Sequence, residues 1–238
     1  MKYAIIAAGE GSRLMSEGVA LPKPLVPICG EPMIDRLVRI FTENGADEIC
    51  IIVNRLHPQT EAHVRHLMAQ PGHAPIRLAV ETTPSSMHSF NVLAPWLEDA
   101  PFCLTTVDTI FREDDFAAYI RAFRQGQGGL MAVTDYIDDE KPLYVGTDAD
   151  LRITGFHDSD EGDRYISGGI YALQPEAIAT LRRCMAEGRS RMRNFQRALV
   201  EDGLELHAWP MSKVLDVDHA SDIAKAEAFL SETPTPQP

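Results

Sequence analysis

The sequence has little that would cross-link the chain or hold it in a membrane. Its 238 residues include four cysteines, whose spacings match neither a CxxC pair nor another metal-ligand pattern. The apolar runs are as long as strands, whereas a membrane-spanning helix needs about 20 apolar residues. No pattern of a cleavable leader is recognised either. We therefore expect a cytoplasmic protein with reduced thiols and no transmembrane segment.

Positive charge is also scarce. Lysine and arginine together number 22 against 35 acidic residues, which gives a formal net charge of -13. Such an excess of acid argues against nucleic acid or an anionic membrane as a non-specific partner. A phosphate site in this protein must therefore be a local pocket of basic residues. A chain of this length buries roughly 70% of its unfolded surface, so disulfides and structural metal are not required for a core.

The first half of the sequence alternates strands with helices. The continuously apolar run at residues 3–8 is typical of a central parallel strand covered on both faces. A helix is predicted at 32–44. Further strands are predicted at residues 49–53, 76–80 and 102–107, and further helices at 59–69, 86–96 and 114–125. This alternation predicts right-handed βαβ units around a mostly parallel sheet.

In the second half of the sequence, the first four predicted strands follow one another without helices between them, so this half of the sheet is expected to be antiparallel or mixed. Short strands with only turns between them are predicted at residues 130–134, 144–147, 153–156 and 165–173. Two more strands are predicted at 204–209 and 214–217, and helices at 176–186, 191–202 and 221–230. Because no repeat or linker divides the sequence, we predict one domain over residues 1–230 and a frayed, proline-rich tail over 231–238.

A glycine loop follows the first predicted strand and contains Gly9 and Gly11. A loop at the carboxyl end of a parallel strand can present backbone N–H groups to an anion, and glycine permits close approach. The dinucleotide fingerprint fails because its third glycine would fall on Leu14, and no Gly-Lys-Ser/Thr of a P-loop occurs. Taken by itself, the loop is more simply explained as an ordinary glycine turn than as a phosphate-binding loop.

Two charged residues stand out beyond the loop. Lys23 lies between Pro22 and Pro24, which fix the local backbone and reduce the entropy lost in aiming its ammonium group. Asp108 ends a buried strand, at the sheet edge where open α/β folds bind ligands. Its carboxylate is a hard-oxygen ligand suited to Mg²⁺, and the alternative is that it caps the turn before Phe111.

Three separated motifs carry a family resemblance. Residues 7–13 read AAGEGSR, residues 23–25 read KPL and residues 30–33 read GEPM. In this order they resemble the nucleotidyltransferase superfamily that makes NDP-sugars and related activated alcohols, including the sugar-phosphate nucleotidyltransferases and the choline-phosphate cytidylyltransferases. The resemblance implies an α/β fold of the nucleotide-diphospho-sugar transferase type, with a Rossmann-like, mostly parallel but mixed sheet flanked by helices.

The resemblance also implies the roles of individual residues. Arg13, Lys23 and Asp108 would be catalytic, the two basic side chains holding the triphosphate and Asp108 binding the metal. The residues implied to bind the nucleotide are Ala7, Ala8, Gly9, Glu10, Gly11, Ser12, Arg13, Lys23, Glu81 and Ser86. The residues expected at the acceptor are Gly168 and Gly169, in a strand that reads SGGIY, and Lys213.

A second metal ligand is implied near the end of the chain. Residues 215–222 read LDVDHASD and resemble two versions of a family motif, one of which points to Asp218 and the other to Asp216. Alternation along a strand places both carboxylates on one face, so both are candidates to share one Mg²⁺ with Asp108. Asp222 is instead predicted to cap the final helix.

Two segments depart from the pattern of the sugar-activating members. Residues 85–89 read SSMHS where many members have Gly-Thr-Ala, which is closer to the choline-phosphate branch. Residues 156–159 read FHDS in place of the usual Glu-Lys-Pro turn. The resemblance is therefore strong at both ends of the chain and loose in the middle.

The predicted function is Mg²⁺-dependent nucleotidyl transfer, in which the phosphate oxygen of a sugar 1-phosphate or similar acceptor attacks the α-phosphorus of an NTP. The products are an NDP-activated compound and pyrophosphate. The alternatives are a choline-phosphate-type cytidylyltransferase, a nucleotide-binding homologue without turnover, and a glycosyltransferase that consumes an NDP-sugar. The last normally has Asp-x-Asp where this sequence has Asp108, Thr109 and Ile110. The identity of the NTP, the acceptor and the oligomeric state are left open.

Two clusters have plainer explanations. The histidines at 57, 63, 66 and 73 have loose spacing and no cysteine partner, so a solvated surface is favoured over a zinc site. Six arginines between residues 182 and 197 are expected to form a solvated helical surface, with an acceptor-phosphate or subunit contact as the alternative.

Overall fold

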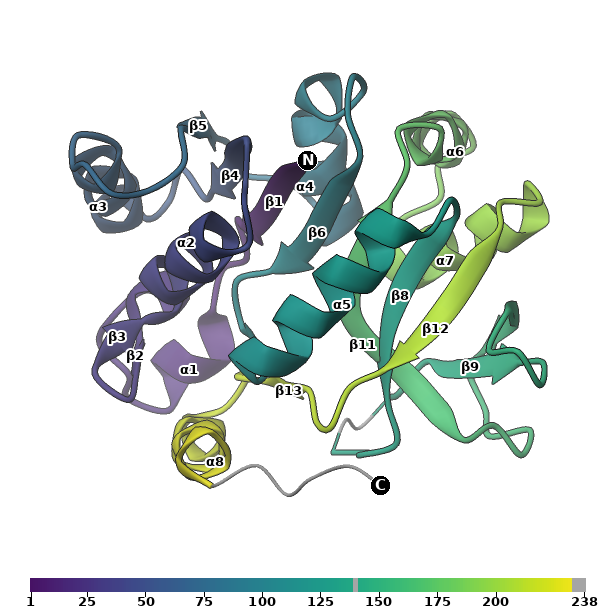
Figure 1. Cartoon of the computed structure of the whole chain (residues 1–238). Helices are drawn as coiled ribbons and strands as arrows, with labels where there is room; N and C mark the ends of the chain where they lie inside the picture. Colours follow the sequence, from purple (N-terminus) through teal and green to yellow (C-terminus); the bar gives the residue numbers. More distant parts are fainter. Residues whose placement is uncertain (139–140, 233–238) are drawn as a thin grey trace.

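A nine-stranded sheet forms the centre of the molecule over the residues that the structure describes. The computed structural model describes residues 1–138 and 141–232. Along the sheet the strands follow the order β10-β9-β11-β6-β1-β4-β5, and β8 links β11 to β12 (Figure 1). Helices lie on both faces, as the sequence predicts.

The first half of the sheet is parallel. Strand β1 (Lys2–Ala7) lies between β4 (Glu48–Val53) and β6 (Phe102–Thr106), and β5 (Ile76–Val80) forms the edge beyond β4. The side chains of β1 are buried from Tyr3 onwards because helices cover both faces of the strand. The predicted strands are therefore confirmed here, except that Ala8 lies outside β1 and Val107 lies outside β6.

The second half of the sheet contains both antiparallel and parallel pairs, which confirms the expectation of an antiparallel or mixed arrangement. Strand β11 (Tyr165–Leu173) pairs antiparallel with β6, β8 (Gly129–Thr134) and β9 (Tyr144–Thr147). Strand β10 (Ile153–His157) is antiparallel to β9, and β12 (Leu206–Pro210) is parallel to β8. Since β11 contacts three strands, it joins the two halves of the sheet.

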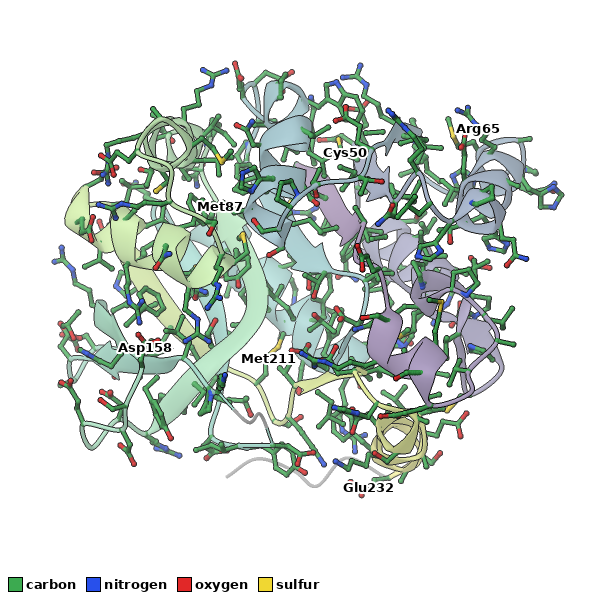
Figure 2. All side chains as sticks on the ribbon, turned by 180° about the vertical axis from the view of Figure 1, so that it is seen from behind. Cys50, Arg65, Met87, Asp158, Met211 and Glu232 are labelled. Carbon is green, nitrogen blue, oxygen red and sulfur yellow. The ribbon has the colours of Figure 1, made fainter. Side chains whose placement is uncertain are left out.

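One apolar cluster lies on each face of the sheet. One lies beneath α2 (Met33–Glu43), α5 (Glu113–Gln125) and α8 (Ala220–Ser231), and Figure 1 looks onto this face. The other lies beneath α4 (Ser86–Leu93), α6 (Ala177–Ala186) and α7 (Met192–Glu201), on the side seen in Figure 2. Helix α3 (Pro58–Met68) packs next to β5.

The end of the chain differs slightly from expectation. Ser231 was predicted as part of the tail but closes α8. Residues 233–238, the rest of that tail, lie outside the described residues. The single domain over residues 1–230 stays a prediction. No helix of the described residues combines the length and the apolar character that spanning a bilayer requires.

Several elements of two to five residues are too short to leave a periodic signal in the sequence. They are helix α1 (Ser12–Ser16), the 3₁₀ turns η1 (Lys23–Leu25) and η2 (Ala94–Trp96), and the strands β2 (Pro27–Ile28), β3 (Glu31–Pro32), β7 (Thr109–Ile110) and β13 (Leu215–Asp216). Strand β13 is the part of the predicted 214–217 strand that pairs, and its partner is β7. This pairing carries the end of the chain to the neighbourhood of Asp108.

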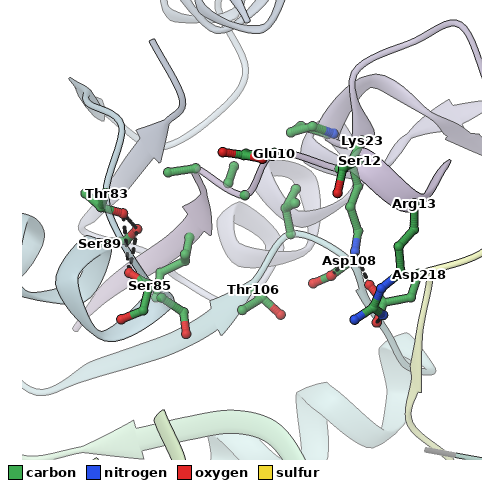
Figure 3. A pocket seen from close by; sticks show the side chains of 18 of the residues that line it. Glu10, Ser12, Arg13, Lys23, Thr83, Ser85, Ser89, Thr106, Asp108 and Asp218 are labelled. Carbon is green, nitrogen blue, oxygen red and sulfur yellow. Dashed lines mark hydrogen bonds and ion pairs between the residues drawn. The ribbon is translucent and has the colours of Figure 1, made fainter. Parts of the chain in front are cut away.

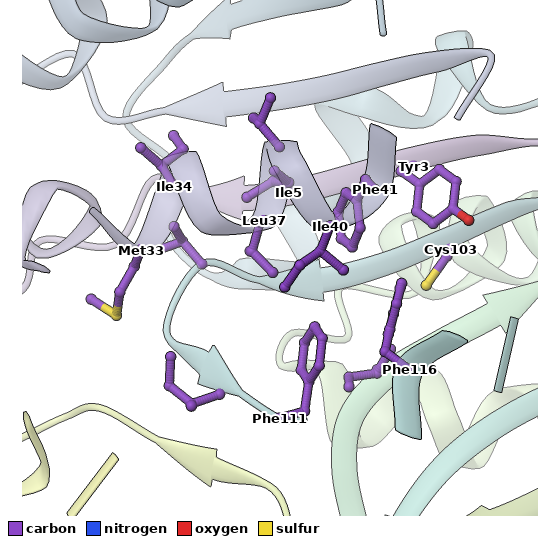
Figure 4. Close-up of a cluster of buried hydrophobic side chains, with 14 of the residues drawn as sticks. Tyr3, Ile5, Met33, Ile34, Leu37, Ile40, Phe41, Cys103, Phe111 and Phe116 are labelled. Atoms are coloured by element: carbon purple, nitrogen blue, oxygen red, sulfur yellow. The ribbon is translucent and has the colours of Figure 1, made fainter. Parts of the chain in front are cut away.

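A stack of aromatic rings fastens α2 and α5 to the sheet (Figure 4). The ring of Phe41 lies 4.6 Å from that of Tyr3 and 5.5 Å from that of Phe116, centroid to centroid. Phe116 in turn stacks on Phe111 at 4.8 Å. All four rings are completely buried, so the stack adds aromatic contacts to the burial of apolar surface.

We expect Phe41→Ala to lower the free energy of unfolding by about 3–5 kcal/mol, because it removes buried area and leaves a cavity between Tyr3 and Phe116. Urea denaturation of the purified protein measures this loss. Leu56→Ala is the control, since Leu56 is 63% exposed and its truncation should change stability by less than about 0.5 kcal/mol. Equal losses in the two variants would contradict the central place given to the stack.

Candidate active site

The glycine loop after β1 passes close to Lys23 at Gly11. Gly11 has a φ of +62°, in the left-handed region that favours glycine. A Cβ atom at position 11 would lie 3.0 Å from the Cβ of Lys23. Glycine is therefore required here for two reasons, the backbone conformation and the close approach of the lysine stem.

Lys23 lies between two carboxylates in the structure (Figure 3). Its Nζ forms ion pairs with Asp108 Oδ2 and, at 2.7 Å, with Asp218 Oδ1. The lysine side chain is only 11% exposed and that of Asp108 18%, whereas Asp218 is 44% exposed, so the pair with Asp108 is the better shielded of the two. The structure thus brings together three of the residues expected at the catalytic and metal sites.

Arg13 contacts the same aspartate from the other side. Its Nη1 lies 2.8 Å from Asp218 Oδ2, while 63% of the arginine side chain remains exposed. Arg13 is the second residue of α1, which begins directly after the glycine loop. The cleft therefore has one shielded and one accessible cation, both paired with Asp218.

The charges of this cluster stabilise one another. Burial opposes the charge on Lys23, but the nearby Asp108 and Asp218 carboxylates outweigh this effect and raise the pKa of the ammonium group. Burial likewise opposes the charge on Asp218, but the hydrogen bond from Lys23 and the charges of Lys23 and Arg13 lower its pKa. Lys23 is therefore cationic and Asp218 anionic at neutral pH.

Asp218 is held in the cleft by backbone contacts on both sides. Upstream, Val217 N donates to Asp108 O at 3.1 Å beside the β13–β7 pair. Downstream, Asp222 Oδ2 accepts hydrogen bonds from Asp218 N at 3.2 Å and His219 N at 2.8 Å. Asp222 occupies the third position of α8 in a capping box, which confirms that it caps the final helix.

Hydrogen bonds to Glu17 connect the start of α8 with the end of α1. The Glu17 carboxylate lies 2.6 Å from His219 Nδ1 and accepts a hydrogen bond from Ala220 N, also at 2.6 Å. The backbone hydrogen bond from Ala220 and that from His219 lower the pKa of Glu17. This pair was not expected from the sequence, because the two residues are about 200 positions apart.

Two clefts meet at the charged cluster. The first, of about 400 Å³, is lined by the glycine loop, Lys23, residues 83–86, Ser89, residues 106–108 and Asp218. The second, of about 410 Å³, is lined by β11, the segment around β13, the start of α8 and Tyr136. Arg13 and Asp218 line both clefts, so the clefts share a charged wall.

The first cleft contains most of the residues that the sequence assigns to the nucleotide. Those that line it are Ala7, Ala8, Gly9, Glu10, Gly11, Ser12, Arg13, Lys23 and Ser86, together with Asp108. Glu81 does not line either cleft, and its backbone N–H donates to Val53 O at 3.0 Å at the exposed end of β5. Its proposed contact with the nucleotide has no support in this geometry.

The residues assigned to the acceptor are divided. Gly168 lines the second cleft, but Gly169 and Lys213 line neither cleft. The ammonium group of Lys213 lies 3.9 Å from the ring centroid of Tyr136 and 5.3 Å from that of Phe229. A cation–π contact therefore holds Lys213 behind the wall that Tyr136 forms, although Asp216 is only three residues away.

The two candidate carboxylates near the end of the chain also separate. Asp218 lines both clefts and contacts Lys23, whereas Asp216 lies on β13 opposite Thr109 and lines only the second cleft. The expectation relied on strand alternation as far as Asp218, but β13 ends at Asp216 and both carboxylates line only the second cleft in common. The geometry therefore favours Asp218 as the partner of Asp108.

Asn54 is a structural residue that the sequence reasoning missed. It is buried at the end of β4, where Nδ2 donates to Ala8 O at 2.9 Å and Oδ1 accepts from Thr82 Oγ1 at 2.7 Å. It thereby fixes the glycine loop against the segment that precedes α4. A polar residue directly after a buried parallel strand is a signal that would have singled it out.

The histidine and arginine clusters lie outside both clefts. His63 pairs with Asp35 at 2.6 Å, and His57 Nε2 contacts Glu10 O at 3.0 Å behind the glycine loop. Among the described residues no group of three or more His, Cys, Asp or Glu side chains is placed to hold a metal ion. Arg193 and Arg197 both pair with Asp158 on the surface, which agrees with a helical surface of ion pairs.

Comparison with known families decides the relationship of the chain. The family model described as the MobA-like NTP transferase domain matches residues 3–198. The chain belongs to this family. The match includes the glycine loop, Lys23 and Asp108, and it ends before Asp218.

Curated relatives of this MobA-like protein include sugar-phosphate nucleotidyltransferases. A mannose-1-phosphate guanyltransferase of Candida glabrata is 28% identical over 192 residues, which are 75% of this chain and 51% of the relative. A glucose-1-phosphate thymidylyltransferase of Actinoplanes is 25% identical and is covered over 68% of its length, against 85% of this chain. The chain thus spans about half the length of the guanyltransferases that it matches.

Solved structures show the same fold over the whole chain. A putative glucose-1-phosphate thymidylyltransferase from Bacillus anthracis, in complex with a sucrose, has a TM-score of 0.83 at 20% identity, and 100% of this chain and 98% of that chain are covered. The inositol-1-phosphate CTP transferase from T. maritima has a TM-score of 0.78 at 16% identity, with 97% and 96% covered. The fold class predicted from the sequence is therefore confirmed.

We expect Asp222→Ala to lower the free energy of unfolding by about 1 kcal/mol, because two backbone N–H groups at the start of α8 lose their acceptor. Chemical denaturation monitored by circular dichroism measures the loss. Asp222→Asn is the matched control, since its amide oxygen still accepts a hydrogen bond, and a smaller loss is expected. If both variants lost equally, the capping contact would not be what Asp222 contributes.

Proposed function

We propose that the protein is a Mg²⁺-dependent nucleotidyltransferase that couples an NTP to a sugar 1-phosphate, giving an NDP-sugar and pyrophosphate. The observation that carries this proposal is the junction of the two clefts, where Lys23, Arg13, Asp108 and Asp218 meet. Such a junction suits a reaction that joins two phosphorylated substrates, with the first cleft for the NTP and the second for the acceptor.

The transfer is an in-line displacement for which positioning and charge neutralisation supply most of the catalysis. The glycine loop lines the first cleft with backbone, and Lys23 and Arg13 offer positive charge to the triphosphate. The acceptor's phosphate oxygen forms the new bond to the α-phosphorus. The bond from that phosphorus to the bridging oxygen breaks, and pyrophosphate leaves with the bond electrons, so no covalent enzyme intermediate is needed.

The donor set suits a magnesium ion held by Asp108 and Asp218. Asp108 Oδ1 is buried and has no hydrogen-bond partner among the described residues. Mg²⁺ usually takes one or two protein carboxylates and completes its shell with waters and phosphate oxygens, which matches a pair of aspartates better than a full protein cage. When bound, the ion would neutralise negative charge on the phosphates.

The acceptor proposal rests on the relatives and on the chemistry of the second cleft. The relatives named above act on mannose 1-phosphate and glucose 1-phosphate, and a structural neighbour is named for inositol 1-phosphate. Tyr136, Asp138, Ser167 and Ser221 line the second cleft and offer hydrogen-bonding groups for a hydroxyl-rich acceptor. A sugar 1-phosphate therefore fits better than phosphocholine, which carries no hydroxyl groups.

A screen for pyrophosphate release tests the proposal. The purified protein is incubated with Mg²⁺, each common NTP in turn, and a panel of sugar 1-phosphates, phosphocholine and polyol phosphates. We expect pyrophosphate and, by mass spectrometry, an NDP-sugar from at least one sugar 1-phosphate. Turnover of phosphocholine alone would favour the cytidylyltransferase alternative, and release from no pair would leave a binding protein or an NDP-sugar consumer.

With the productive pair, we expect Lys23→Ala to lower kcat/KM by about 10² or more, because a donor that stabilises developing charge is typically worth about 3 kcal/mol in the transition state. Steady-state kinetics measure the effect, and circular dichroism checks that the fold is retained. Near wild-type turnover would make Lys23 a loop residue without a catalytic role.

We expect Asp108→Asn and Asp218→Asn to remove Mg²⁺-dependent turnover, because each takes one charged oxygen ligand from the proposed ion. Asp216→Asn is the comparison variant and should lose less, since Asp216 lines only the second cleft. Rates measured across a Mg²⁺ titration separate the three variants. A larger loss in Asp216→Asn than in Asp218→Asn would move the second ligand to Asp216.

A further inference from the structure

The ammonium group of Lys23 occupies the place between the two carboxylates that would hold the metal. Its Nζ pairs with Asp108 Oδ2 and with Asp218 Oδ1, the latter at 2.7 Å (Figure 3). A divalent cation bound by the same carboxylates would stand directly beside this ammonium group. Two cations in direct contact repel each other strongly where little solvent separates them.

The charges of the cluster cancel when no substrate is bound. Lys23 and Arg13 contribute two positive charges, and Asp108 and Asp218 contribute two negative charges. A metal ion arriving alone would add positive charge to a balanced cluster. A nucleotide arriving alone would add negative charge beside the two aspartates. The charge of each ligand is therefore uncompensated until the other ligand is also bound.

The backbone at Lys23 is restricted, while its ammonium group lies at the end of a flexible side chain. Pro22 and Pro24 restrict the backbone on both sides of Lys23. The flexible part is the chain of methylene groups beyond Cβ, which reaches into the first cleft. A triphosphate in that cleft would give the ammonium group new oxygen partners in place of the two carboxylates.

We propose that Lys23 acts as a built-in counter-ion that the metal and the nucleotide displace together. In the free protein it neutralises Asp108 and Asp218. When both ligands bind, the metal takes the carboxylates and the ammonium group turns to the phosphates. Metal alone then binds weakly, and metal and nucleotide strengthen each other's binding by the same factor, as linkage requires.

This inference rests on the proposed function in one respect, because it takes Asp108 and Asp218 as the metal site. Its test is metal binding without nucleotide, so it needs no turnover. Titration with Mn²⁺, followed by the electron paramagnetic resonance signal of the free ion, gives the dissociation constant. We expect Lys23→Met to bind Mn²⁺ at least ten-fold more tightly than the wild type, whereas Lys23→Arg, which keeps the charge, should bind as weakly as the wild type.

Lys2→Met is the matched control. Lys2 also pairs with two carboxylates, Asp99 at 2.7 Å and Glu48 at 3.6 Å, and is 15% exposed, but it lies at the far end of β1. Its variant should bind Mn²⁺ as the wild type does. The double variant with Lys23→Met and Asp108→Asn should lose the gain, because one of the two ligands is gone.

Three results would overturn the proposal: unchanged Mn²⁺ affinity in Lys23→Met, an equal gain in Lys2→Met, or a gain that survives Asp108→Asn. If Lys23→Met does not fold without metal, Lys23→Gln replaces it, and the rise in Tm on adding Mn²⁺ is compared with that of the wild type. A larger rise in the variant supports the proposal, and an equal rise contradicts it. A protein inactive with every NTP but with the expected Mn²⁺ gain would disprove the function and leave this inference standing.

Discussion

Lys23 lies between Asp108 and Asp218, and the rest of the site is arranged around these two ion pairs. A largely buried ammonium group is stable only with partners, because removing a charge from water is costly unless other charges or hydrogen bonds compensate. The two carboxylates supply that compensation, and they come from distant parts of the chain. The fold must therefore bring residues 23, 108 and 218 to within hydrogen-bonding distance before the site exists.

The sheet is the main element that brings these residues together. Strands β1 and β6 are parallel neighbours, so the glycine loop after β1 and Asp108 after β6 emerge at the same edge. The short β7–β13 pair then carries the end of the chain across this edge, and the cap on α8 fixes the backbone of Asp218. A contact between Glu17 and the start of α8 closes the arrangement from the side of α1. Small elements thus decide the geometry of the charges, while the large elements provide a rigid support.

The charged residues lie where the two clefts meet. Most of the first cleft is made by the parallel half of the sheet, and much of the second by β11 and the segments that follow it along the chain. Arg13 and Asp218 belong to both, so any ligand in one cleft is felt electrostatically in the other. This shared wall is the feature on which the proposed reaction between two phosphorylated partners rests.

The sequence by itself determined the alternation of strands and helices, the sheet edge at which the glycine loop and Asp108 meet, and most of the residues of the first cleft. It could do so because long apolar runs, helical periodicity and glycine or proline positions are local properties. It could not decide between Asp216 and Asp218, because the sequence does not show that the paired strand ends at Asp216, before the residue that contacts Lys23. It also assigned Glu81 and Lys213 to the substrates, whereas Glu81 is exposed directly after β5 and the rings of Tyr136 and Phe229 contact Lys213. Pairings across 100 or 200 residues, such as Lys23 with Asp218 or Glu17 with His219, were decided only by the tertiary structure, since no local pattern encodes which distant surfaces will pack together.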